Sequence, residues 1–80
     1  MPRIIDSSKN NLIGSHLRTV RIRKKISQQQ LSDRLETYAV YVCRGSISRI
    51  ESGERTVTDI EIDGFCKVLH VSLDTLFYGK

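Results

Sequence analysis

Apolar residues recur along this chain at spacings of three and four, the period of an amphipathic helix. In the first such segment, over about residues 12–24, Ile13, Leu17 and Val20 fall at positions i, i+4 and i+7. Two lysines end the segment, where cations interact favourably with the helix dipole. The pattern predicts a first helix, preceded by an N-terminal arm over residues 1–11 that lacks any sustained period.

A second helix is predicted to begin after Ser27, whose hydroxyl can accept a hydrogen bond from a free backbone N–H. Gln30 stands three residues later, as in a capping box, and Leu31 and Leu35 give the helix its buried face. The helix should end within residues 36–41. The β-branched and aromatic residues there alternate with a period of two, but so short a segment between helices favours a packed loop over a strand.

A third helix is predicted over about Arg44–Ser52, with a thin apolar stripe and a polar outer face. Ile47 and Ile50 point inward at i and i+3, which leaves the remaining side chains toward solvent or a partner. Gly53 can take the left-handed conformation that ends a helix. Cys43 stands at the N-cap position, for which cysteine is a poor residue.

Two further helices complete the predicted fold, which is all-α and forms a single domain over residues 12–78. Thr58 and Glu61 form another capping-box pattern, and Ser72 can cap a last short helix. The apolar positions of these two helices repeat at helical spacing: Ile62, Phe65, Cys66 and Leu69 in the fourth, and Leu73, Leu76 and Phe77 in the fifth. The sequence therefore predicts five short helices around one core.

Charge is unevenly distributed along the 80 residues, whose formal net charge is +4. Residues 1–35 carry eight basic and two acidic side chains, whereas residues 36–80 carry five basic and seven acidic ones. The basic half suits a polyanion, and the acidic half suits protein contact or solvation. No apolar run approaches the roughly 20 residues that span a bilayer, so no membrane association and a cytoplasmic location are expected. A domain this small buries limited surface, so a partner subunit would help its stability.

The two cysteines, Cys43 and Cys66, are far apart and show no CxxC spacing. We expect two reduced thiols, with Cys66 in the core. A disulfide or redox-sensing role for Cys43 is an alternative. A metal site with His16 and His70 is another, but no ligand pair has a spacing typical of zinc, so no metal is predicted.

The second and third helices together have the shape of a helix-turn-helix, in which the second helix of the pair lies in the DNA major groove. Arg44 and Arg49 could each contact guanine in bidentate fashion or hold a phosphate. Gly45 and Ser46 allow close approach, and Gln28 suits a phosphate oxygen. Together with two residues beyond the helix, the residues predicted to contact DNA are Gln28, Arg44, Gly45, Ser46, Arg49, Ser52 and Arg55.

The strings SQQQL at residues 27–31 and SISRIESGER at residues 46–55 resemble the XRE family, the Cro and lambda-repressor type of helix-turn-helix protein. The resemblance covers about residues 12–77. It implies a five-helix lambda-repressor-like domain that binds DNA as a dimer on a palindromic operator. It also implies a structural ion pair between Arg21 and Glu51, positions at which the family often pairs an arginine with a glutamate.

The chain departs from this family between the second and third helices, where we expect a connection about five residues longer than usual. Val42 still matches the apolar turn residue, which places the insertion within Glu36–Tyr41. The angle between the two helices is therefore not fixed by the resemblance. Tyr38 and Tyr41, both in the inserted stretch, are candidates to reach the DNA backbone.

The sequence predicts a non-catalytic, sequence-specific double-stranded DNA-binding protein: a transcriptional regulator, and more specifically a repressor, acting as a homodimer. No nucleophile–base arrangement or glycine-rich phosphate loop points to an enzyme, and no cofactor or small-molecule effector is expected. The candidates for the dimer surface are Val71, Leu73, Leu76, Phe77 and Tyr78. The alternative is a protein-interaction module, such as an antitoxin-like or anti-repressor partner, which the acidic second half favours.

Overall fold

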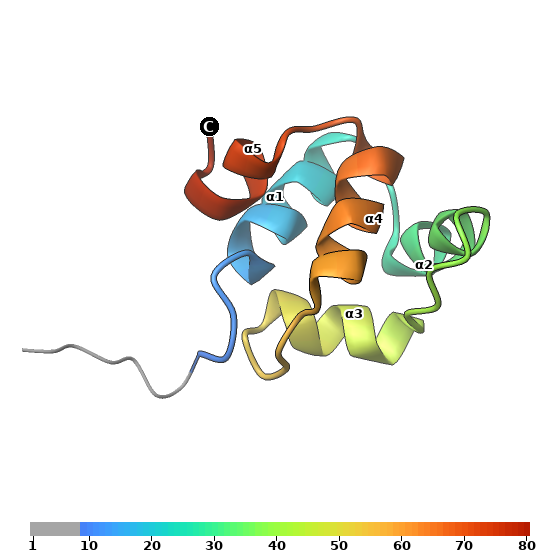
Figure 1. Ribbon diagram of the computed structural model, residues 1–80, viewed down its shortest axis with the longest axis horizontal. Helices are drawn as coiled ribbons and strands as arrows, with labels where there is room; N and C mark the ends of the chain where they lie inside the picture. Colours follow the sequence, from blue (N-terminus) through green and yellow to red (C-terminus); the bar gives the residue numbers. More distant parts are fainter. Residues whose placement is uncertain (1–8) are drawn as a thin grey trace, which may run out of the picture.

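Over residues 9–80, the part of the chain that the structure describes, the computed structural model contains five helices and no strand. The helices are α1 (Gly14–Arg23), α2 (Gln28–Glu36), α3 (Arg44–Glu51), α4 (Asp59–Leu69) and α5 (Leu73–Tyr78), as Figure 1 shows. The prediction of a five-helix, all-α fold is confirmed. Residues 1–8 of the predicted N-terminal arm lie outside the described residues.

Side-chain caps fix the starts of three helices at the predicted residues. Ser27 accepts a hydrogen bond from the Gln30 backbone N–H, while the Gln30 side chain accepts one from the Ser27 N–H. Thr58 and Glu61 form the same reciprocal arrangement at the start of α4. Ser72 accepts from the Thr75 N–H at the start of α5. These caps supply acceptors for backbone donors that the first helical turn leaves without partners.

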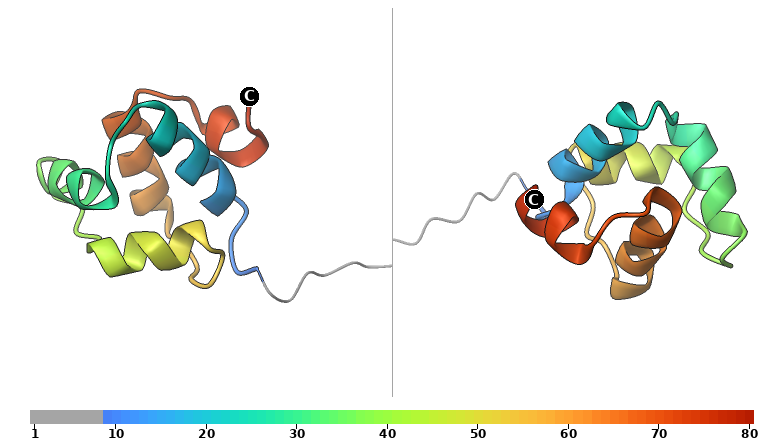
Figure 2. Two further views of the ribbon diagram at one scale, coloured as in Figure 1. Left: turned by 180° about the vertical axis from the view of Figure 1, so that it is seen from behind. Right: turned by 90° about the horizontal axis from the view of Figure 1, so that it is seen from above.

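The core forms where all five helices meet. Its fully buried side chains are Ile13, Leu17, Leu31, Leu35, Ile47, Ile50, Phe65, Leu69 and Leu76. α1 packs against α3, α4 and α5, and α2 packs against α3 and α4. This arrangement leaves α3 along one edge of the molecule and α5 along the opposite edge (Figures 1 and 2).

The structure corrects two predicted positions in the second half of the core. Cys66 is only half-buried and packs against the core from outside, because it lies at the edge of the apolar stripe of α4. Leu73, which the helical spacing placed with Leu76, is 54% exposed. α5 has six residues, so it turns only one side fully inward and leaves its first residue in solvent.

The segment before α1 is held against the end of α3. Asn10 donates its backbone N–H to the Gly53 carbonyl, and the Asn11 amide donates to the carbonyls of Ile50 and Arg55. Asn11 also accepts from the Gly14 N–H through its side-chain oxygen. Residues 10 and 11 of the predicted arm are therefore part of the folded domain.

Gly14 lets α1 approach α3 closely. A Cβ atom at this position would overlap the backbone carbonyl oxygen of Ile50. Because a backbone atom cannot move aside as a side chain can, any larger residue here would push the two helices apart.

None of the helices in the described residues is both long enough and apolar enough to cross a membrane.

Candidate nucleic-acid interface

The two sides of α3 have opposite character. Ile47 and Ile50 are fully buried, as predicted, and fix the helix against α1 and α2. The outer side carries exposed polar residues along its whole length, ending at Ser52, which caps the helix. Gly53 follows with φ of +83°, the left-handed conformation expected at this helix end. α3 is thus anchored through one face and exposes the other to solvent.

Arg44 and Arg49 are the cationic groups of this outer face. Both are exposed, and within residues 9–80 neither forms an ion pair. A Cβ built at Gly45 would meet only the Arg49 Nη1 atom, at 3.9 Å. The Arg49 guanidinium therefore extends back toward the first turn of α3, where Arg44 begins the helix. Both positive charges gather at the end of the helix that enters the major groove in helix-turn-helix proteins.

Ser46 lies beside the N-cap residue of α3. Its hydroxyl accepts a hydrogen bond from the Cys43 thiol at 3.5 Å, and hydrogen bonding by Ser46 lowers the pKa of that thiol from its ordinary value. Cys43 is exposed and is not disulfide-bonded. Burial instead raises the pKa of the Cys66 thiol. No cluster of three metal-ligating side chains occurs in the described part of the chain.

A buried ion pair joins α1 to the last turn of α3. Arg21 Nε and Nη2 donate to the two carboxylate oxygens of Glu51, at 2.6 and 3.0 Å, and Arg21 Nη1 donates to the Ile26 carbonyl. The exposed fractions of the Arg21 and Glu51 side chains are 11% and 3%. The two residues implied as a structural ion pair are therefore in bidentate contact, away from solvent.

Gln28, in the first turn of α2, is drawn into the same network. Its amide nitrogen donates to Glu51 Oε1 at 3.0 Å. A side-chain amide has two hydrogens, so one remains for an outside acceptor such as a phosphate. The bond to Glu51 fixes the position of this amide relative to α3, and its phosphate contact stays a prediction.

Ser52 and Arg55 already have partners within the protein. The Ser52 hydroxyl is 2.8 Å from a Glu54 carboxylate oxygen and also bonds to the Arg49 carbonyl. Arg55 donates to both carboxylate oxygens of Glu61, at 3.0 and 2.9 Å. Arg55 therefore holds the loop after α3 to α4, whereas Ser52 bonds within the end of α3 and the loop itself, and the DNA contacts of both residues stay a prediction.

The Arg55–Glu61 pair predicts a pH-dependent stability. Hydrogen bonding by Arg55 holds the pKa of Glu61 below its ordinary value of 4.5. A lowered carboxyl pKa stabilises the folded state above pH 4.5, and that contribution is lost as the pH falls through the folded-state pKa. Glu61→Gln, which preserves the capping box, should lower the free energy of unfolding by about 1 kcal/mol at neutral pH.

Urea unfolding of both proteins at pH 7 and at pH 2 checks this expectation. The difference between them should shrink at pH 2, because protonation of Glu61 removes the interaction that lowers its pKa. Asp63→Asn, which breaks an exposed pair with Lys67, is the matched control and should change the stability little at either pH. A Glu61→Gln effect that is equal at the two pH values would contradict the assignment.

Asn11 is a structural residue of the interface that the sequence pattern did not predict. Its amide links the start of α1 to the Ile50 carbonyl, in the last turn of α3, and to the Arg55 carbonyl in the loop beyond it. An Asn three residues before a helical glycine is a local N-cap signal, since its side-chain oxygen can accept from a backbone N–H. The contact with α3 has no local signal, because the two segments are about forty residues apart.

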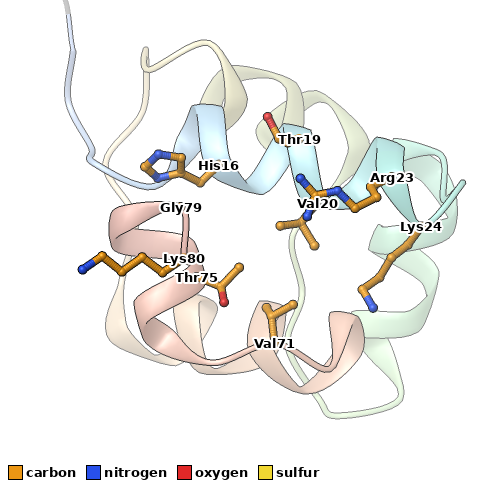
Figure 3. Close-up of a pocket in the computed structure, with 9 residues that line it drawn as sticks. All are labelled: His16, Thr19, Val20, Arg23, Lys24, Val71, Thr75, Gly79 and Lys80. Atoms are coloured by element: carbon orange, nitrogen blue, oxygen red, sulfur yellow. The ribbon is translucent and has the colours of Figure 1, made fainter.

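A basic hollow lies between α1 and α5, away from the outer face of α3 (Figure 3). Arg23, Lys24 and Thr75 are among the residues that line it. His16 Nδ1 lies 2.8 Å from the Leu76 carbonyl, a contact that holds α5 against α1. Positive charge is thus spread over α1, in the basic first half of the chain, as well as carried by Arg44 and Arg49 on α3.

The comparison with protein families agrees with this geometry. The family model described as helix-turn-helix matches residues 17–76, which include part of α1, all of α2, α3 and α4, and most of α5. A search of curated proteins found no match. Because the family match covers most of the chain and agrees with the arrangement of α2 and α3, the chain belongs to the XRE-type helix-turn-helix family of DNA-binding transcription regulators.

Proposed function

We propose that this protein is a transcriptional repressor that binds a palindromic operator as a homodimer. In each subunit, α3 enters the major groove, and the two copies lie in successive grooves about 34 Å apart. Its place of action is the cytoplasm, where operator DNA is accessible. The observation that carries the proposal is the outer face of α3, where Arg44 and Arg49 are exposed and unpaired within the described residues.

The proposed contacts divide into those that read bases and those that hold the backbone. Arg44 and Arg49 can reach guanine edges, with Gly45 and Ser46 leaving room for close approach. Gln28 supplies a phosphate contact from the start of α2. Ser52 and Arg55 should contribute less to DNA binding, because each already donates a hydrogen bond to an acidic side chain of the protein.

The test is selection of bound duplexes from a random pool, followed by a salt titration on the selected sequence. We expect an inverted repeat with half-sites one helical turn apart. With six or more phosphate contacts, affinity should fall by about a thousandfold between 50 and 200 mM salt. A reporter promoter that carries the selected site should lose expression when the protein is present.

A different result would support another function. Weak binding to every duplex, with little dependence on salt, would contradict the proposal. It would favour the protein-interaction module, for which the acidic residues 36–80 could supply the contact surface. Increased reporter expression with the same operator would retain DNA reading but replace repression by activation.

The proposed dimer surface is the part of α5 that is exposed, which includes Leu73 and Tyr78. Both side chains are exposed, and Leu73 borders a hollow that Ile62 and Phe77 also line. Leu76, one of the five predicted contact residues, is fully buried, so it belongs to the core. We propose that a second copy of the chain packs on this surface of α5, because two inverted half-sites require two copies of α3 related by a two-fold axis.

Leu73→Glu should convert a dimer to a monomer, because a charge at this position would be buried without a partner in the interface. Sedimentation equilibrium measures the change in mass. Leu12→Glu places the same charge on an exposed leucine before α1 and should leave the dimer intact. A Leu73→Glu protein that stays dimeric would place the interface elsewhere.

A further inference from the structure

The connection between α2 and α3, residues 37–43, has a fixed exit from α2. Ala39 has φ of +61°, and its N–H donates to the Glu36 carbonyl. The Val40 N–H then donates to the Leu35 carbonyl at 3.0 Å. These two bonds form a Schellman motif, so the backbone leaves the helix in one direction. A left-handed alanine costs energy that only a well-determined surrounding structure can offset.

Two buried valines hold the rest of the connection. Val40 and Val42 both belong to the core. Val40 lies against α4, where its methyl groups would be 3.2 and 3.3 Å from a Cβ at Gly64. Side chains alternate along extended backbone, so Tyr41, between the two valines, is directed outward and is 73% exposed. The exposed Tyr41 side chain is thus attached to a backbone segment that the two buried valines hold in place.

Tyr41 lies at the N-terminal end of α3. It lines the same surface hollow as Arg44 and Ser46. Asp33 and Glu36 line that hollow from α2, so an anion would approach from the α3 side. On that side are Arg44 and the Arg49 guanidinium, which extends back toward Gly45.

Tyr38 faces a different part of the molecule. Its ring lies 6.0 Å from the Lys67 Nζ, so it packs toward α4. Lys67 is itself paired with Asp63 on the same helix. The two tyrosines of the connection, which the sequence could not distinguish, are therefore directed toward different elements.

We propose that Tyr41 donates its hydroxyl to a DNA phosphate beside the first turn of α3, and that Tyr38 makes no DNA contact. This inference rests on the proposed function. Tyrosine is among the side chains that bond to DNA phosphates. Its two side-chain torsions cost little entropy when they are fixed on binding. The lengthened connection then adds a backbone contact next to the base-reading arginines.

The matched pair Tyr41→Phe and Tyr38→Phe tests the assignment, because each change removes one hydroxyl from an exposed ring. On the duplex selected for the wild-type protein, Tyr41→Phe should bind about tenfold more weakly, as expected for loss of a hydrogen bond to a charged group. Tyr38→Phe should stay within about twofold of wild type. Thermal melting of both variants should be unchanged. Equal affinities for Tyr41→Phe and wild type would overturn the proposal.

A scan with single methylphosphonates identifies the partner atom. At one phosphate position, neutralisation should weaken the binding of the wild-type protein but not that of Tyr41→Phe. At every other position, the two proteins should respond alike. If Tyr41→Phe instead changes base preference without coupling to any phosphate, the phosphate assignment is overturned. Failure of the proposed function is distinguishable, since the wild-type protein would then select no duplex at all.

Discussion

Replacing Arg21 by methionine will lower the free energy of unfolding by about 3–5 kcal/mol. The Glu51 side chain is only 3% exposed. Without Arg21, the Gln28 amide is the remaining side-chain donor to its carboxylate among the described residues. The change also removes the donor to the Ile26 carbonyl. A domain of this length has a total stability of roughly 4–12 kcal/mol, so the loss is a large share of it. Urea unfolding followed by circular dichroism measures the difference.

The double variant Arg21→Met with Glu51→Met separates ion pairing from packing. Replacing both members of a buried pair by apolar residues of similar size is often neutral, so the double variant should regain most of the lost stability. Lys67→Met breaks an exposed pair and should change the stability little. If Arg21→Met keeps its stability but loses DNA binding, Arg21 is a contact residue rather than a structural one.

Arg44→Ala and Arg49→Ala will each weaken binding to the selected operator by about 1–3 kcal/mol, or roughly 5- to 150-fold. Both residues are exposed on the outer face of α3 and are not paired within residues 9–80. If an arginine reads a guanine, its removal also relaxes the preference at that base pair alone. Fluorescence anisotropy with the operator and its single-base variants measures both effects.

Lys24→Ala is the control for charge. Lys24 follows α1 and lines the hollow beside α5, on the side of the molecule opposite α3. Its removal takes away one positive charge without changing base preference. An arginine that holds a phosphate would instead weaken binding to all duplexes equally and reduce the salt slope by about one. If both arginine variants bind the operator with unchanged affinity, α3 is not the helix that reads the DNA bases.

The helix starts could be predicted because their determinants are local. Ser27 with Gln30, and Thr58 with Glu61, are three residues apart in sequence and bond to each other in the structure. The inward positions of Ile47 and Ile50 follow from the period of the helix alone. The all-α fold and the two-sided character of α3 were therefore within reach of the sequence.

Side-chain partners and burial that depend on the packing of one element against another were predicted less well. Arg55 was predicted to contact DNA, and the structure places its guanidinium on Glu61 of α4. Leu73 and Leu76 have the same residue type at helical spacing, yet one is exposed and the other fully buried. Tyr38 and Tyr41 were equivalent candidates until Lys67 and the α3 terminus distinguished them. In each case the deciding neighbour comes from another element.

The sequence by itself determined the helices, their caps and the polar outer face of α3. Interactions over three or four residues set these features, and each is a repeating or local pattern. Only the tertiary structure decided which charged groups stay free. Arg55 meets the Glu61 carboxylate of α4, whereas Arg44 and Arg49 meet none in the described residues; the family resemblance had implied only the pair of Arg21 with Glu51. Pairing depends on distance in space, which the packing of α1, α3 and α4 around the core sets and no local pattern encodes.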